Sequence, residues 1–211
     1  MGHGYPILLD VSRRKILIVG GGKVAARKAA GLVDAGASDV TAVSPQFMAE
    51  FPASVRKVQE IYSASLLDGV SLVFAATNRS EVNDQIVEDA QARDILVNRA
   101  DSDEDHPGDF VTPAKYQDHN VMLTVSAASA ALAAHIRDAL QRRWDPRWTK
   151  MADAMRSLRP WIRDRTKLTQ DQRAIIFRAL AGNDAMDVLD VGGIDALRKW
   201  LVEKHPELRD A

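Results

Sequence analysis

Three consecutive glycines, Gly20, Gly21 and Gly22, stand between a short apolar run and an alanine-rich stretch. The run Lys15–Val19 has no polar alternation, which is typical of a parallel strand that is covered on both faces. Residues 24–35 have the composition of a helix, and Gly36 follows where such a helix would end. The glycines therefore form either a plain tight turn or a turn at which the backbone approaches a bound phosphate.

The spacing of these residues favours the phosphate. Gly20, Gly22 and Ala25 fit the pattern G-x-G-x-x-A, placed after a strand and at the start of a helix. In that pattern the first glycine makes the turn, the second admits a pyrophosphate, and the alanine lets the helix pack closely on the strand. The first helical residues, Lys23 and Val24, then present backbone amides to the anion. The motif predicts that these five residues bind a dinucleotide.

The rest of the chain predicts an α/β protein with a Rossmann-type parallel sheet, a small second element and a helical C-terminal domain. We place the boundaries at residues 1–113, 114–145 and 146–211. Expected strands cover residues 15–19, 39–44, 71–77, 95–101, 109–114 and 120–127. Expected helices cover residues 24–35, 80–93, 129–143, 147–163, 169–181 and 193–204. All four tryptophans lie in the last third, where we expect them to pack in a core or a dimer contact.

The end of the second strand bears on the choice of cofactor. Residues about 20 positions past the glycines usually include an acid that binds the adenosine ribose, or an arginine that binds a 2′-phosphate. Here the chain offers Ser44 and Gln46 and neither of those side chains. This favours NAD over NADP, with Ser44 as a cofactor contact.

Composition excludes several other classes. The formal net charge is -1, without the basic excess of a nucleic-acid-binding protein. The chain has no cysteine, which rules out disulfides, thiolate metal sites and a cysteine nucleophile. None of the five histidines is paired at the spacing of a helical metal site, so we expect no resident metal. Without an apolar run long enough for a membrane span, we expect a cytoplasmic protein that contacts no membrane.

Five segments, taken in order, resemble a known family. They are "ILIVGGGKVAARKAAGLVDAGA", "LVFAATNRSEVNDQIVEDA", "ILVNRAD", "DFVTPA" and "LTVSAASAALAAHIRDAL". Their order and spacing resemble the precorrin-2 dehydrogenase and sirohydrochlorin ferrochelatase family over about the whole chain. The resemblance implies oxidation of precorrin-2 to sirohydrochlorin with NAD, and in some members insertion of ferrous ion to give siroheme. It also implies a homodimer.

The resemblance assigns roles to individual residues. Asp101 closes the "NRAD" segment and matches the family's catalytic carboxylate, which would act as a general base. A carboxylate at the carboxyl end of a parallel strand is also where open α/β sheets place their ligands. Ala76 and Thr77 match a turn near the nicotinamide, and Asn83 matches an asparagine that we interpret as a local structural hydrogen-bonding group. A solvent-exposed loop acid is the alternative for Asp101.

The chain departs from the family at the expected substrate side. Relatives carry two glycines and a proline where this chain has "SAASAALAAHIR", although Ser126, Ser129 and Arg137 remain as candidate substrate-binding residues. The arginines of residues 137–165 form either an ordinary solvated face or the cations that an octacarboxylate substrate would need. His106 lies in the acidic loop after Asp101, which is longer than usual for the family, and it is either a pocket residue or a solvated loop residue.

The sequence also bears on two other classes of function. An NAD-sensing module without catalysis would share the glycine turn but would not need Asp101. A reductase with a tyrosine–lysine pair has no support, since no lysine stands four residues after Tyr5, Tyr62 or Tyr116.

Overall fold

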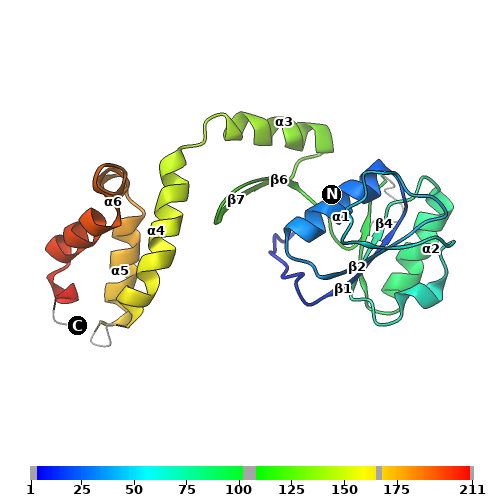
Figure 1. The fold of residues 1–211 in the computed structure, drawn as a ribbon, viewed down its shortest axis with the longest axis horizontal. Coiled ribbons are helices and arrows are strands. Elements are labelled where there is room, and N and C mark those ends of the chain that lie inside the picture. The colour runs from blue at the N-terminus through cyan, green and yellow to red at the C-terminus, as the bar shows by residue number, and fades with distance from the viewer. Residues whose placement is uncertain (1–3, 102–107, 165–167, 210–211) are drawn as a thin grey trace. The chain divides into compact units, whose positions relative to one another are not determined.

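The computed structural model describes residues 4–101, 108–164 and 168–209. The chain divides into two compact units, Met1–Thr112 and Pro113–Ala211 (Figure 1). The boundary falls one residue before the predicted end of the first domain. The further division of the second unit at residue 145 stays a prediction.

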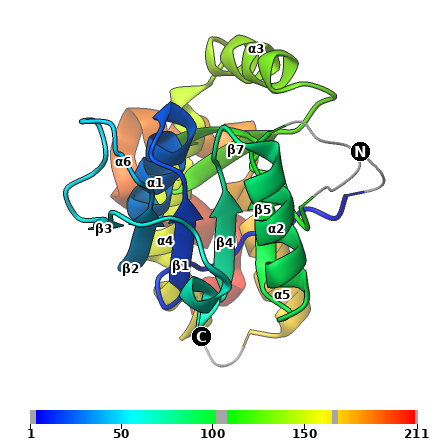
Figure 2. The ribbon, with the colours of Figure 1, turned by 90° about the vertical axis from the view of Figure 1, so that its right-hand side faces the viewer.

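The first unit is built on a five-stranded parallel sheet. Its strands lie in the order β3-β2-β1-β4-β5, as Figure 2 shows. They are β1 (Lys15–Val19), β2 (Asp39–Val43), β3 (Arg56–Val58), β4 (Leu72–Ala75) and β5 (Leu96–Arg99). Because the order reverses between β1 and β4, the carboxyl ends of these two strands flank the crevice in which such sheets bind ligands.

Helices cover both faces of this sheet. Residues Ala25, Ala26 and Ala29 of α1 (Lys23–Asp34) pack on one face in a core that includes Ile16 and Ile18. The helix α2 (Ser80–Gln91) and the short 3-10 helix η1 (Ala64–Leu67) contribute to a second core on the other face. The predicted α/β fold of the Rossmann type is confirmed.

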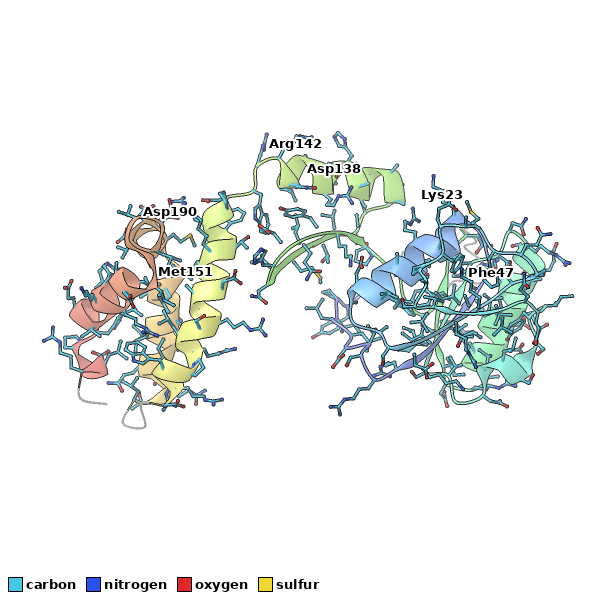
Figure 3. All side chains as sticks on the ribbon, viewed as in Figure 1. Lys23, Phe47, Asp138, Arg142, Met151 and Asp190 are labelled. Carbon is cyan, nitrogen blue, oxygen red and sulfur yellow. The ribbon has the colours of Figure 1, made fainter. Side chains whose placement is uncertain are left out.

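The second unit begins with an antiparallel hairpin, β6 (Ala114–Asp118) and β7 (Val121–Val125). The helix α3 (Ala130–Gln141) contacts both of these strands. Three further helices follow, α4 (Pro146–Arg163), α5 (Gln170–Leu180) and α6 (Asn183–Lys204), with the 3-10 helix η2 (Pro206–Leu208) at the end. They enclose a third core, into which Met151 points from α4 (Figure 3).

Two expectations about secondary structure were wrong. Residues 109–113 form no strand, because the polar groups of this segment bond to β5 outside a regular ladder: Asp109 Oδ2 accepts from the amide of Val97 at 2.9 Å, and Phe110 O accepts from Asn98 Nδ2 at 2.7 Å. The last helix begins at Asn183 and not near residue 193. Gly193 has φ +68° and interrupts it, so the expected start marks a kink between two helical segments.

The tryptophans divide into two groups, in keeping with the expected packing role. Trp161 and Trp200 pack against the third core. Trp144 makes edge-to-face contacts with Tyr116 and Trp148, each with ring centres 5.1 Å apart. Trp144 Nε1 also donates to Asp118 Oδ2 at 3.1 Å, which ties β6 to the start of α4.

Lys28 of α1 gives a prediction about stability and pH. Its Nζ donates to Thr112 Oγ1 at 3.0 Å and lies 5.3 Å from the ring centre of Phe74. Burial, with a smaller effect from Arg27, lowers the pKa of Lys28 to about 8. Between that value and the ordinary lysine pKa of about 10.4, the unfolded chain binds more protons than the folded chain, so wild-type stability rises with pH in this window. Below pH 8 Lys28 is protonated in the folded and the unfolded chain, and the full cost of burying its charge lowers the stability.

We therefore expect Lys28→Met to raise the free energy of unfolding at pH 7 by roughly 1–3 kcal/mol. The difference from wild type should shrink as the pH rises from 8 to 10.5, which urea denaturation at several pH values measures. Lys57→Met is the control, since Lys57 also stands over an aromatic ring, that of Phe51, but is exposed. A difference that stays constant with pH would contradict the role given to Lys28.

Candidate functional site

Gly20 makes the turn out of β1 in a conformation that requires glycine. Its φ is +134°, and a Cβ at this position would lie 2.2 Å from the carbonyl oxygen of Ala76. The amide of Gly20 donates to Val43 O at 2.9 Å. The turn is therefore fixed against the carboxyl ends of both β4 and β2, and it brings Ala76 and Thr77 next to the glycines.

Gly21 is an essential residue that the sequence pattern missed, because G-x-G-x-x-A leaves its position open. A Cβ here would lie 1.8 Å from Gln46 O and 2.7 Å from Ser44 Oγ. The carbonyl of Gly21 also accepts from the amide of Met48 at 2.9 Å. The middle glycine thus lets the segment after β2 pass across the turn, and this packing places Ser44 beside it.

Gly22 is the N-cap of α1 and faces open space. A Cβ on Gly22 would meet no atom within 4 Å. No side chain caps the helix, and its first turn carries no acidic residue. Because the first amides of a helix lack intrahelical acceptors and carry a partial positive charge, this end is chemically suited to an anion. Figure 3 shows Lys23 at this end of α1.

Ala25 serves the packing role that the motif predicts, since it is fully buried between α1 and the sheet. Its small side chain brings the helix close to β1, which directs the first amides of α1 at the space in front of Gly22. The residues present therefore fit the pyrophosphate of a dinucleotide.

Asn83, fully buried in α2, connects the end of β4 to Asp101. Its Oδ1 accepts from the amide of Thr77 at 3.2 Å and from Thr77 Oγ1 at 2.7 Å. Its Nδ2 donates to Thr77 O at 3.3 Å and to Asp101 Oδ2 at 2.9 Å. Asn83 therefore makes the local hydrogen bonds expected of it and also holds the candidate base next to the turn that packs on Gly20.

Arg99, the last residue of β5, is a second organising residue that the sequence did not single out. Its Nε donates to Asp101 Oδ1 at 2.6 Å and its Nη2 to Asp101 Oδ2 at 3.2 Å. On its other side the guanidinium pairs with Asp84 and donates to Ser80 Oγ at 2.8 Å. An arginine in a strand of the first unit would ordinarily be taken for a surface residue, so sequence alone carried little signal for it.

These contacts set the charge of the site. Burial works to raise the pKa of Asp101, but the hydrogen bonds from Arg99 and Asn83 outweigh it and hold that pKa below the ordinary value. The same bonds, with those to Asp84, raise the pKa of Arg99. Asp101 is thus a stable anion at neutral pH, with a side chain that remains 32% exposed.

The candidate substrate-binding residues lie in the second unit. Ser126 is exposed just after β7. Ser129 caps α3, its Oγ accepting from the amide of Leu132 at 3.2 Å. Arg137 donates to the neighbouring Asp138 Oδ1 through Nε at 2.8 Å. Their role in binding substrate stays a prediction.

Two further expectations concern metals and membranes. His106 lies outside the described residues. Among residues 4–101, 108–164 and 168–209, no three histidine, aspartate or glutamate side chains gather in a way that would hold a metal ion. Within the same ranges, every helix is too short or too polar to cross a membrane.

Comparison with known proteins places the chain in a family. Residues 7–114 match the model of the family described as "Putative NAD(P)-binding". The chain belongs to this family. The matched residues cover the whole parallel sheet, the glycine turn and the network around Asp101.

Relatives of this NAD(P)-binding chain carry a more specific name. A siroheme synthase of Methylobacillus flagellatus is 30% identical over 206 residues, covering 93% of this chain and 44% of the relative. A siroheme synthase of Zymomonas mobilis is 32% identical over 206 residues, covering 94% and 43%. The chain thus spans less than half the length of these relatives.

A solved structure agrees with the fold. SirC, described as a precorrin-2 dehydrogenase, superimposes with a TM-score of 0.76 and 24% sequence identity, covering 95% of this chain and all of that one. At this identity the agreement establishes the fold alone.

Proposed function

We propose that this NAD(P)-binding chain oxidises precorrin-2 to sirohydrochlorin with NAD, in siroheme biosynthesis. The observation that carries the proposal is the chain of contacts from Gly20 through Ala76, Thr77 and Asn83 to Asp101. It joins an anion-binding helix start to a carboxylate at the carboxyl ends of the strands. The names of the related siroheme synthases and of SirC support the choice of substrate.

The chemistry divides between cofactor and protein. The nicotinamide supplies the hydride acceptor when NAD is bound. The amides at the start of α1 would hold the pyrophosphate, and Ala76 and Thr77 would border the nicotinamide. Asp101 takes the proton that the substrate loses with the hydride. Because its pKa is held low, Asp101 is a weak base that passes the proton on to water, which its partial exposure permits.

NAD is the proposed cofactor because of the segment after β2. Ser44 and Gln46 lie against the glycine turn. Neither offers the positive charge that a 2′-phosphate would require.

A homodimer is proposed on the exposure of the hairpin. In β6 and β7 half-buried residues alternate with exposed ones, and in α3 the one fully buried residue is Ala133. A two-stranded hairpin is marginal on its own, so packing against a second copy would supply the missing burial. Arg137 lies on α3, Ser129 caps that helix and Ser126 follows β7. They are the proposed substrate-binding residues, because an octacarboxylate needs cations and donors.

The proposal covers two activities: oxidation of precorrin-2 alone, or oxidation followed by insertion of ferrous ion. In both cases the proposed location is the cytoplasm. The alternative function is an NAD sensor, which would use the glycine turn and not Asp101.

An anaerobic absorbance assay tests the proposal. Precorrin-2 generated enzymatically is mixed with the protein and NAD, sirohydrochlorin is followed, and ferrous ion is then added. We expect oxidation that depends on NAD and is faster than the spontaneous reaction. In a separate measurement, analytical ultracentrifugation, we expect the protein to sediment as a dimer. If the protein binds NAD but leaves precorrin-2 unoxidised, the sensor replaces the dehydrogenase.

A further inference from the structure

We propose that Arg99 is a positioning residue for Asp101: its guanidinium orients the carboxylate so that Oδ1, which receives fewer donors from other residues than Oδ2, is left to accept a substrate proton. The inference deepens the proposed function and rests on it for the identity of that proton. Arg99 does not itself touch the reacting atoms in this proposal; its partners include Asp101 and, on α2, Asp84 and Ser80.

The count of hydrogen bonds carries the orientation. A carboxylate has about four acceptor positions, two on each oxygen. Oδ2 of Asp101 accepts two bonds, from Asn83 Nδ2 at 2.9 Å and Arg99 Nη2 at 3.2 Å. Oδ1 accepts one from another residue, Arg99 Nε at 2.6 Å, and the backbone amide of Asp101 also bonds to its own carboxylate. From the other described residues Oδ1 therefore receives fewer donors than Oδ2, on a side chain that is partly exposed.

The rigidity of Arg99 makes this orientation durable. Its side chain is 2% exposed, and its guanidinium is held on the far side by Asp84 and Ser80. A planar guanidinium that meets a carboxylate with Nε and Nη2 together fixes both the distance and the plane of its partner. Asp101 consequently cannot rotate without breaking contacts that a buried charge needs.

The packing of the sheet does not require an arginine at the end of β5. The strands β1, β2 and β4 end in Val19, Val43 and Ala75, all buried and apolar. Ala75 is the register neighbour of Arg99. Burying a guanidinium costs several kcal/mol before its partners compensate. An apolar residue would complete the edge of the sheet without that cost, so the arginine is explained by its carboxylate partners.

The electrostatics agree with the geometry. The charged groups described around Asp101 are Arg99 on β5 and, through Arg99, Asp84 on α2. The positive charge lowers the pKa of Asp101 and the negative charge of Asp84 competes for it. Removing the charge of Arg99 should therefore raise the pKa of Asp101, and removing the charge of Asp84 should lower it.

The test combines two measurements on the full-length protein. The first is the titration of the Asp101 carboxyl by ¹³C NMR without substrate, assigned by the signal lost in Asp101→Asn. The second is the pH dependence of kcat/KM for precorrin-2. Both are made on wild type, Arg99→Met and Asp84→Asn. Arg93→Met is the matched control. Like Arg99, Arg93 pairs with an aspartate of α2, but its partner is Asp89, near the C-terminal end of that helix and away from Asp101.

We expect Arg99→Met to move the titration, and the acidic limb of kcat/KM, to higher pH by about one unit or more. Asp84→Asn should move both to lower pH, and Arg93→Met should move neither. If Arg99→Met does not fold, the opposite shift in Asp84→Asn still tests the proposal, because the side chain of Asp84 is 31% exposed and asparagine has nearly the same shape.

The remaining outcomes separate the two proposals. Folded variants whose Asp101 titrates as in wild type would overturn the role of Arg99. An NMR shift accompanied by an unmoved rate profile would also overturn it, because Asp101 would then be tuned without consequence for the reaction. If wild type leaves precorrin-2 unoxidised while the NMR shifts occur, the dehydrogenase is overturned and the orientation of Asp101 by Arg99 is supported.

Discussion

Asp101→Asn should lower kcat/KM for precorrin-2 oxidation by about 10²–10⁴-fold, the usual contribution of a positioned general base. Asparagine has nearly the same shape but cannot take the proton. Affinity for NAD should be unchanged, because the contacts at Gly22 do not involve Asp101. Anaerobic steady-state rates at saturating NAD, together with calorimetric titration of NAD, measure the two effects.

The control for this substitution is Asp94→Asn, the same change at the opposite end of β5. Asp94 has φ +54°, a conformation that asparagine also tolerates. We expect it to leave both quantities near the wild-type values. A rate for Asp101→Asn within a few-fold of wild type would remove Asp101 as the base.

Gly22→Asp should weaken NAD binding by at least about a hundredfold while the fold is kept. The new carboxylate would occupy the open space before α1 and repel the pyrophosphate, and like charges brought together cost several kcal/mol, where 1.4 kcal/mol is tenfold. Aspartate is at the same time a better N-cap than glycine, so the thermal unfolding midpoint should stay the same or rise. Calorimetric titration of NAD and thermal denaturation separate the two effects.

Gly182→Asp makes the same exchange at another helix start and serves as its control. Gly182 is the N-cap of α6, also without a side-chain cap. This variant should bind NAD as wild type does. Equal loss of affinity in both variants, or none in Gly22→Asp, would show that the start of α1 does not hold the pyrophosphate.

The elements that sequence predicted well are those whose burial has a simple pattern. Strands β1, β2, β4 and β5 lie within their expected ranges. The clearest are β1 and β4, because a strand covered on both faces is apolar over nearly all of its length. The strand β3 was missed, since it is three residues long and two of them, Arg56 and Lys57, are charged and exposed. Residues 109–113 were mistaken for a strand because side-chain bonds to β5, such as that of Asp109, leave no mark in composition.

The site was predictable where chemistry depends on local spacing. The pattern of Gly20, Gly22 and Ala25 needs only neighbouring residues to be recognised. The functions of Gly21 and Arg99 depend on segments distant in sequence, the chain after β2 for one and α2 for the other. Such contacts arise only when the chain has folded.

The attachment of Asp109 and Phe110 to β5 has a consequence for how Asp101 keeps its position. The chain leaves β5 at Asp101, which Arg99 and Asn83 hold. It is bound to the same strand again at Asp109, whose amide donates to Val97 O at 2.8 Å. The carboxylate is therefore held by side chains of β5 and α2, so changes of sequence between these two anchors should leave its position unchanged.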